Sequence, residues 1–343
     1  MRKVVISLII IILVFFLPSF NLNEKKQVYF NLSKYIYETQ KLNQKEYKFS
    51  SFTYNNKGDI IYLYQLYKAR GTLLININTV SGTLGYRLIP QIKVPSICCI
   101  NNKNELIIFE RSGGNKIHYI SPSVNILTFD NPSFPISIIK TNYEGIFYWL
   151  GYNYKENKKT DGNIYLFTMK SNKINKINLT ENLKNQKILD VVPVNTDSFI
   201  AIVKSDKGFK AIKYDKKTTT LVEGKKILIN SSYKDTFYIS FVDGNKMKIY
   251  KYLPSMDFLQ ELYQVSIKGK EILYVDIIEN IDKNYIFYVS LKDNNEYDVN
   301  ILNVNDNSEQ VSIASKVLPF LSYKKPLTIL YPLEYFLTVD LFE

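Results

Sequence analysis

Few residues of this chain could carry out acid–base or metal chemistry. His118 is the only histidine, so a metal site built from several histidines is excluded, and a Ser-His-Asp triad would have to use this one residue. His118 lies in the stretch KIHYI, and the chain has no Gly-x-Ser-x-Gly, Walker or Gly-x-Gly-x-x-Gly sequence. We therefore predict that His118 is a strand residue with a satisfied hydrogen bond. We predict no catalytic, cofactor-binding or metal-binding residue, and no cofactor.

The thiol and indole side chains are equally few. Cys98 and Cys99 are the only cysteines and are adjacent. Neighbouring Cα atoms lie about 3.8 Å apart, below the usual disulfide range, and in a strand the two side chains point to opposite faces. Both are predicted to be buried, unreactive thiols. Trp149 could stack on a sugar, but its apolar setting IFYWLGY predicts a core residue.

Two stretches, Asp293 to Glu296 and Asn303 to Asn307, are rich in side-chain oxygen atoms from Asp, Asn and Glu. The second starts like a calcium-binding loop but has Ala314 at the twelfth position, where a bidentate Glu is needed. Both stretches are predicted to be turns between strands. A carboxylate pair for glycoside hydrolysis would have to come from separate parts of the chain, which the sequence does not reveal.

A strand-rich module recurs from Phe49 to the C-terminus and must position these residues. Each copy has an apolar strand, a polar turn and a more aromatic strand, as in SICCINNKNELIIFE. The equivalent core positions are Phe52, Ile97, Ser137, Leu189, Leu228, Leu273 and Leu318. Their spacing of 39 to 52 residues is the period of a propeller blade and too long for most helical solenoids.

One complete module shows four strands joined by tight turns. It runs from Leu189 to Glu223, with turns at Asn195 to Asp197, Asp206 to Gly208 and Lys216 to Thr218. Further hairpin signals are Ser81-Gly82, Ser112 to Asn115, Asp161 to Asn163 and Asp243 to Asn245. No long helical pattern separates the modules, which disfavours an α/β fold.

The chain is therefore predicted to be an all-β propeller, most simply with seven four-stranded blades; six blades with one irregular module is the alternative. The last module lacks a fourth strand, and the segment from Val28 to Tyr37 has strand character. Pairing the two would close the ring and hide both edges. Strands such as GIFYWLGY are apolar on both faces, which favours stacked blades over a membrane barrel with a polar lumen.

The N-terminus has the layout of a secretory signal. Met1-Arg2-Lys3 precedes the apolar run from Val4 to Leu17, and no Cys follows for lipidation. We predict export to the periplasm or cell surface, with residues 4–17 either removed or kept as an anchor. The predicted organisation is residues 1–23 as signal peptide or anchor, 24–48 as spacer and closing strand, and 49–343 as propeller.

The net charge of +12 does not indicate a nucleic-acid reader. Only four of the 44 basic residues are Arg, the residue suited to bidentate phosphate and base recognition. The lysines are scattered through turns and strand faces, which is typical of a solvated surface.

The modules resemble the TolB-type, PD40-like propeller repeats, distant relatives of WD40 repeats. TYNNKGDIIYLY (Thr53 to Tyr64) is similar to the first half of that repeat and SDKGFKAIKYDKKTTTL (Ser205 to Leu221) to the second, although the Pro-Asp-Gly turn of the family is absent. The resemblance implies a disc that binds partners through its loops or central channel, and it implies no chemistry.

The sequence thus favours a non-catalytic protein-binding or scaffolding module in a bacterial cell envelope over an enzyme. The candidate interaction loop is Tyr152 to Asn163, with Tyr152, Tyr154, Lys155, Lys158 and Lys159 as its contact residues. The alternative is a carbohydrate-active enzyme or glycan-binding propeller with acidic residues at the channel mouth. The expected partner is an envelope protein or a glycan, with membrane contact only through an uncleaved N-terminal segment.

Overall fold

The computed structural model describes residues 25–68, 70–111, 116–123, 125–155, 158–184, 186–233, 236–269, 271–279, 284–292, 294–306, 308–324 and 327–342. The predicted leader, residues 1–23, and the hairpin signal at residues 112–115 lie outside them. Within the described part of the chain, no helix is both long and apolar enough to cross a membrane.

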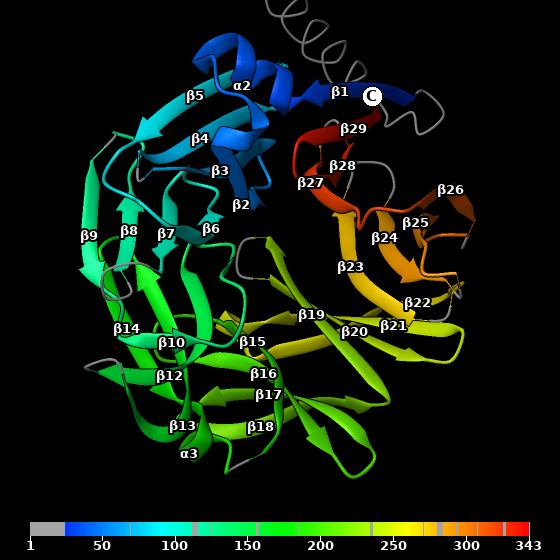
Figure 1. The fold of residues 1–343 in the computed structure, drawn as a ribbon. Helices are drawn as coiled ribbons and strands as arrows, with labels where there is room; N and C mark the ends of the chain where they lie inside the picture. The colour runs from blue at the N-terminus through cyan, green and yellow to red at the C-terminus, as the bar shows by residue number, and fades with distance from the viewer. Residues whose placement is uncertain are drawn as a thin grey trace, which may run out of the picture.

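The strands of these residues form seven antiparallel sheets arranged as a ring, which makes the protein a seven-bladed β-propeller (Figure 1). In six of the seven blades the strand order follows the chain from the inner strand outwards, and in the seventh the outermost strand is the first strand of the chain. Blade 1 comprises β2 (Tyr47–Tyr54), β3 (Asp59–Leu66), β4 (Gly71–Asn78) and β5 (Thr83–Ile89). Blade 2 comprises β6 (Pro95–Ile100), β7 (Leu106–Glu110), β8 (Lys116–Ile120) and β9 (Ile126–Asp130). Blade 3 comprises β10 (Ser133–Pro135), β11 (Lys140–Thr141), β12 (Phe147–Lys155), β13 (Lys158–Lys170) and β14 (Lys173–Asn178).

The remaining blades have the same plan. Blade 4 comprises β15 (Ile188–Pro193), β16 (Phe199–Ser205), β17 (Gly208–Asp215) and β18 (Lys217–Gly224). Blade 5 comprises β19 (Lys226–Tyr233), β20 (Thr236–Asp243), β21 (Lys246–Leu253) and β22 (Phe258–Ser266). Blade 6 comprises β23 (Glu271–Glu279), β24 (Asn284–Leu291), β25 (Tyr297–Asn303) and β26 (Glu309–Ser315). Blade 7 comprises β27 (Phe320–Lys324), β28 (Leu327–Pro332), β29 (Phe336–Phe342) and, from the other end of the chain, β1 (Lys25–Asn31).

The predicted closure of the ring is confirmed. β1 is the outermost strand of blade 7 and pairs antiparallel with β29, from Lys25 opposite Phe342 to Asn31 opposite Phe336. The first and last parts of the chain therefore share one sheet, which protects what would otherwise be an exposed edge of β29.

The predicted strand from Val28 to Tyr37 is wrong in its second half. The strand ends at Asn31, and α2 (Leu32–Gln40) follows. Asn31 caps this helix by accepting a hydrogen bond from the Lys34 backbone N–H at 2.9 Å. Leu32 and Ile36, spaced four residues apart, bury the same helical face between blades 7 and 1. Two further short helices, α3 (Leu179–Asn182) and η2 (Pro254–Met256), lie in connections, and η1 (Gln44–Glu46) precedes β2.

The second strand of each blade is buried on both faces, as the continuous apolar runs predicted. β7, β24 and β28 are buried over most of their length, whereas the outer strands β9 and β18 are largely exposed. Blades therefore pack face to face around their inner halves. Trp149 of β12 illustrates this packing, because it is fully buried, stacks on Phe167 and contacts Phe109 of blade 2 edge to face. Its predicted place in the core is confirmed.

The turns between the first and second strands of successive blades are joined by asparagines. The Asn55 side chain donates to the Asn101 carbonyl at 3.3 Å, Asn101 donates to the Gly145 carbonyl at 2.9 Å, and Asn142 donates to the Pro193 carbonyl at 3.1 Å. Each amide oxygen also accepts backbone N–H groups of its own turn. The Asn101 oxygen, for example, accepts from the N–H groups of Lys103 and Glu105. One residue type thus shapes the turn and ties it to the next blade.

Most predicted hairpins lie where the sequence indicates, and one does not. Ser81-Gly82, the region of Asp206 to Gly208 and Gly244-Asn245 are turns between adjacent strands. Asp161 to Asn163 instead lies inside β13, which begins at Lys158 and pairs with an extended β12. Here Asp161 does not turn the chain; it accepts a hydrogen bond from the Asn163 N–H at 3.0 Å within the strand.

Candidate functional site

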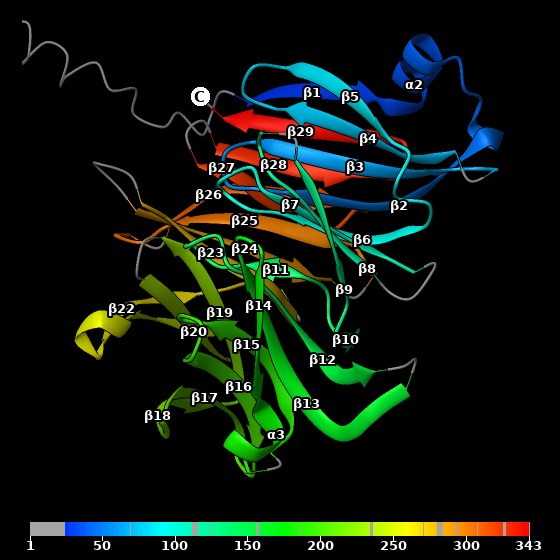
Figure 2. The same cartoon turned by 90° about the vertical axis from the view of Figure 1, so that its left-hand side faces the viewer.

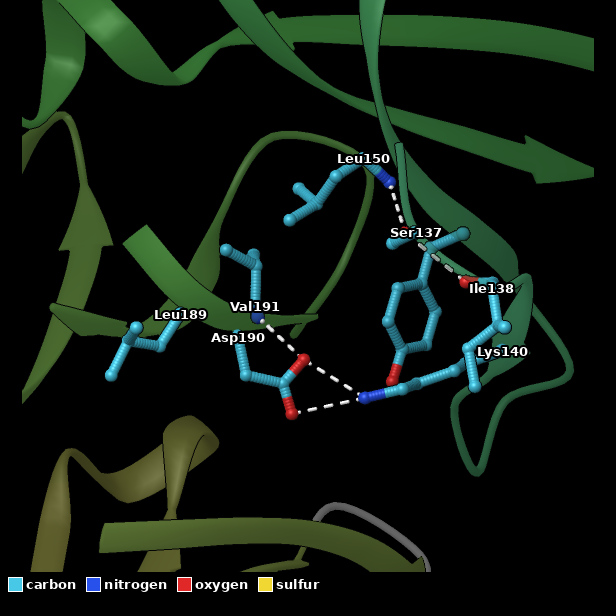
Figure 3. A pocket seen from close by; sticks show the side chains of 8 residues that line it. Ser137, Ile138, Lys140, Leu150, Leu189, Asp190 and Val191 are labelled. Carbon is cyan, nitrogen blue, oxygen red and sulfur yellow. Dashed lines mark hydrogen bonds and ion pairs between the residues drawn. The ribbon is translucent and has the colours of Figure 1, made fainter. Parts of the chain in front are cut away.

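A pocket of about 230 Å³ lies between the inner strands of blades 3 and 4 (Figure 3). One side is the inner strand of blade 3, which is interrupted between β10 and β11; both pieces pair with β12. Ser137, a predicted core position, lies in this interruption, and its hydroxyl accepts a hydrogen bond from the Leu150 N–H at 2.8 Å. The other side is the beginning of β15. Ser137 and Ile138, which lie in this break, both line the pocket.

An ion pair between the two blades crosses this pocket. The Lys140 ammonium lies 2.9 and 3.0 Å from the two carboxylate oxygens of Asp190 (Figure 3). Asp190 also accepts a hydrogen bond from the Val191 N–H at 2.9 Å. Both side chains are about one third exposed, at 38% and 33%. Because the charges compensate each other, the pocket presents a fixed dipole.

Tyr148 supplies the buried wall of the pocket. Burial raises the pKa of its phenol well above the usual value, and the nearby Asp190 carboxylate adds to the shift. The hydroxyl is therefore protonated throughout the neutral range and serves as a hydrogen-bonding group. It is not a base.

Apolar side chains form the outer part of the pocket. Ile138 is 66% exposed and Leu189 is 46% exposed, and both line the pocket from opposite blades. Ile136, 44% exposed, is two residues before Ile138 in the same interruption. We call Ile136, Ile138 and Leu189 the apolar rim. Exposed branched residues that gather around a concave site are typical of a docking surface.

The predicted interaction loop is a β-hairpin beside this rim. Ser133, the first residue of β10, lies opposite Asn153, and β12 continues past it to Lys155. Tyr154 lies opposite Lys159 and Lys155 opposite Lys158, after an irregularity that follows Tyr152. The hairpin therefore extends beyond the start of the inner strand, on the face of the ring where inner strands begin. Ile136 and Ile138 of the apolar rim belong to the same blade as the predicted loop, and Leu189 belongs to the next blade.

A second polar group lies on the inner strands of blades 1 and 6. The buried Asp276 of β23 accepts hydrogen bonds from the Ile277 N–H at 2.7 Å and from the Tyr274 hydroxyl at 3.4 Å. Burial raises the pKa values of Tyr274 and of Tyr54 in β2, and the charge of Asp276 adds to both. These phenols are neutral hydroxyl groups at physiological pH. Asp190 and Asp276 lie in blades 4 and 6, and each has its own partners.

The other chemistry-bearing residues are in structural settings. His118 of β8 is buried; its Nε2 lies 2.8 Å from Glu110 and its Nδ1 lies 3.0 Å from Thr128, so the predicted satisfied strand histidine is confirmed. Cys98 and Cys99 are buried and free, as predicted, and burial raises the pKa of the Cys98 thiol to about 12. Within the described residues, no three His, Cys, Asp or Glu side chains gather closely enough to hold a metal ion.

The two oxygen-rich stretches also lie where turns were predicted. Asn294 and Glu296 lie between β24 and β25 and are hydrogen-bonded to each other, with 2.8 Å from the Asn294 amide to the Glu296 carboxylate. Asn303 ends β25 and caps the following turn by accepting from the Asn305 N–H at 3.0 Å. Asp293 and Asn307 lie outside the described residues.

Sequence reasoning missed Lys140 and Asp190. Both are lone charges on otherwise apolar inner strands, in ISIIKT and ILDVV, and they are separated by 50 residues, about one module. Opposite charges one module apart on inner strands lie in adjacent blades. This spacing of opposite charges is visible in the sequence. It identifies a particular ion pair only when the register of the inner strands in neighbouring blades is known.

The comparisons with known proteins agree on the fold. No family model matches the chain, and no curated protein matches it in sequence. An uncharacterised protein from Listeria monocytogenes superposes with a TM-score of 0.56 at 11% identity, covering 86% of this chain and 91% of that one. An oligogalacturonate lyase in complex with manganese gives 0.54 at 9% identity, covering 85% and 88%.

A third match is to part of a larger protein. Prolyl oligopeptidase B from Galerina marginata gives a TM-score of 0.51 at 11% identity, over 87% of this chain and 49% of that one. The matched proteins thus have varied functions, and identities this low establish the propeller architecture alone.

Proposed function

We propose that this chain is an exported, non-catalytic propeller of the TolB type that captures a protein partner in a bacterial cell envelope. The observation that carries the proposal is the apolar rim, where Ile138 and Leu189 stay exposed around a pocket between two blades. An apolar side chain that fills a pocket and excludes water is the usual energetic centre of a protein–protein contact.

The polar groups of the pocket support binding without catalysis. Lys140 and Asp190 neutralise each other, and Tyr148 is held protonated by burial. Such a pocket orients a ligand by its dipole and hydrogen bonds, while its walls supply the affinity. The apolar run from Val4 to Leu17, preceded by Arg2 and Lys3, supports export.

The hairpin beside the rim indicates the charge of the partner. Its sequence YKENKK carries Lys155, Lys158 and Lys159 against one Glu. Since complementary charge at the border of an interface raises the association rate, we propose a partner with an apolar anchor residue flanked by acidic residues.

The first test is cross-linking of the tagged full-length chain in its own envelope, read by mass spectrometry. The variant Ile138→Asp/Leu189→Asp should recover the partner at least about tenfold less well, because two central contacts are lost. Met256→Asp, at a position that is 74% exposed in η2 of blade 5, is the matched control and should capture normally. Equal recovery with all three proteins would refute the assignment of the rim.

Glycan binding is the second candidate, and it rests on a different group of residues. Neutral hydroxyls of Tyr54 and Tyr274 beside Asp276 offer donors and acceptors of the kind that sugar hydroxyls pair with. Here Tyr274→Phe should weaken binding of purified protein to envelope polysaccharide fragments, and the rim variant should not. Failure of the cross-linking to recover any protein, together with this result, would favour the glycan.

A further inference from the structure

The outer surface of the ring where its two ends meet carries several exposed aromatic residues. It is formed by β1, α2 and β5, which lie on the same outer side of the molecule in both views (Figures 1 and 2). Tyr29 of β1 is 59% exposed, Tyr37 of α2 is 55% exposed, and Tyr86 of β5 is 50% exposed. Leu88 of β5 is 45% exposed. Tyr29 is on the face of β1 towards blade 6, because it lies opposite Thr338 and alternates with Phe30, which packs against blade 1. We call Tyr37, Tyr86 and Leu88, on the blade 1 side, the tyrosine rim.

The backbone under the tyrosine rim is firmly held, so these side chains are presented at fixed places. Leu32 and Ile36 bury the inner face of α2, and the Leu32 N–H donates to the Tyr335 carbonyl at 2.9 Å. Tyr35 on the adjacent face of the helix meets the ring of Tyr86 edge to face, with centroids 6.4 Å apart. The helix and β5 therefore form one continuous surface.

This surface is also positively charged. Residues 25–41 contain four lysines and one glutamate, and one of these lysines, Lys25, is paired with the Asp340 carboxylate at 2.9 Å, which leaves a net charge of +2. Lys26, Lys34 and Lys41 are exposed. Lys34 lies 3.8 Å from Glu38, and both of these side chains are more than half exposed, so they remain open to solvent. Tyrosines at the level of lipid head groups together with lysines are the combination that fits an anionic membrane surface.

We propose that the tyrosine rim docks on an anionic lipid bilayer. The position of the apolar run supports the proposal in addition to the tyrosines and the charge. The run ends at Leu17, and seven residues separate it from Lys25, where β1 begins. Seven residues reach at most about 25 Å, so a retained apolar run would hold this side of the ring near the membrane. In this arrangement the outer edge of blades 7 and 1 contacts the membrane surface. The apolar rim on blades 3 and 4 remains open, which makes this inference independent of the proposed partner.

The test uses the full-length chain reconstituted into vesicles, with a polarity-sensitive maleimide dye at one position at a time. Tyr37→Cys and Tyr86→Cys report on the tyrosine rim, and Thr219→Cys on the exposed outer strand β18 of blade 4 is the control. Cys98 and Cys99 are buried and do not compete for the dye in the folded protein. Vesicles contain either phosphatidylcholine alone or phosphatidylcholine with phosphatidylglycerol.

Dye at positions 37 and 86 should shift to the blue in the anionic vesicles only, and dye at position 219 should not shift in either. When Lys26→Gln/Lys34→Gln/Lys41→Gln is added to each labelled variant, the blue shift of the dye in anionic vesicles should fall to the value in neutral vesicles. Three matched Lys→Gln substitutions at the exposed Lys204, Lys207 and Lys216 of blade 4 should leave the blue shift unchanged. An equal response at all three dye positions would overturn the proposal. So would a response that appears only when envelope proteins are added, because the occupant would then be a protein.

Discussion

The side-chain amide of Asn101 donates a hydrogen bond of 2.9 Å to the backbone carbonyl of Gly145, and thereby joins the inner turn of blade 2 to that of blade 3. Asn101 is fully buried, and its oxygen accepts two N–H groups of its own turn. Gly145 has φ +79°, and a Cβ there would lie 3.0 Å from the Asn101 amide nitrogen. The contact therefore depends on both residue types, and its equivalents at Asn55 and Asn142 make it a recurring device for holding blades together.

Replacing Asn101 by Ala should lower the free energy of unfolding by about 2 kcal/mol or more, because it leaves buried backbone groups without partners on two blades. Urea denaturation followed by circular dichroism measures the effect. Asn56→Ala, in the neighbouring turn but exposed, is the control and should leave the midpoint nearly unchanged. Equal midpoints for the two variants would contradict the joining role.

Two ion pairs in the ring should differ sharply in their contribution to stability. Glu110 and His118 are both buried, and Glu110 also accepts from the Lys93 and Val94 N–H groups at 2.6 and 3.2 Å. Glu110→Ala should therefore cost about 3 kcal/mol or more. Lys140→Ala removes a pair whose partners are one third exposed, so screening by solvent should limit its cost to about 1 kcal/mol. Thermal and urea unfolding of both variants provide the comparison, and a larger loss for Lys140→Ala would contradict the burial argument.

The buried thiols predict a decline of stability at alkaline pH. Burial raises the pKa of Cys98 to about 12, whereas a thiol in an unfolded chain ionises near 8.5. Between these values the unfolded chain loses a proton that the folded protein keeps, so ionisation favours unfolding as pH rises above about 8.5. The free energy of unfolding measured at pH 7, 8, 9 and 10 should therefore fall. The variant Cys98→Ala/Cys99→Ala should show a shallower decline, and an unchanged slope would refute the cause.

Gly224 should tolerate no side chain. A Cβ at this position would overlap the ring of Phe241 in the next blade. Gly224→Ala should therefore destabilise the protein by about 1 to 3 kcal/mol through overpacking between blades 4 and 5. Gly85→Ala on β5, where a Cβ meets nothing within 4 Å, should be neutral or slightly stabilising by less than about 1 kcal/mol. Melting temperatures of the two variants measure the contrast.

The hairpin of blade 3 should control the rate of partner association. Lys155→Glu/Lys158→Glu/Lys159→Glu reverses its charge and should slow binding of the partner recovered by cross-linking, with a weaker dependence on salt. Lys57→Glu/Lys103→Glu/Lys173→Glu changes three exposed lysines in or directly after turns on the opposite face and is the matched control. Surface plasmon resonance at several salt concentrations measures the association rate of both variants. If the control variant slowed association as much as the hairpin variant, the net charge of the protein and not the hairpin would set the rate.

The sequence by itself determined the blades, because a strand buried on both faces must be apolar throughout and this pattern is local. GIFYWLGY and NYIFYVSL are second strands, and the seven copies place them in seven sheets. The spare strand at Val28 was correctly matched to the incomplete last blade, because an unpaired edge needs a partner. The strand ends earlier than the sequence pattern predicts, because Leu32 to Tyr37 is apolar enough for either a strand or a helix. The cap at Asn31 and the space between blades 7 and 1 favour the helix.

Only the tertiary structure decided which side chains meet across blades. Lys140 and Asp190 are 50 residues apart, and the inner strand between β10 and β11 is interrupted in a way that the sequence pattern did not reveal. Ile138 lies in that interruption, and both Ile138 and Leu189 are exposed although their apolar character predicts burial. Local patterns encode which residues can form a strand. Which of those residues stay exposed depends on the register between strands that are distant in the chain. That register is set by how whole blades pack against each other.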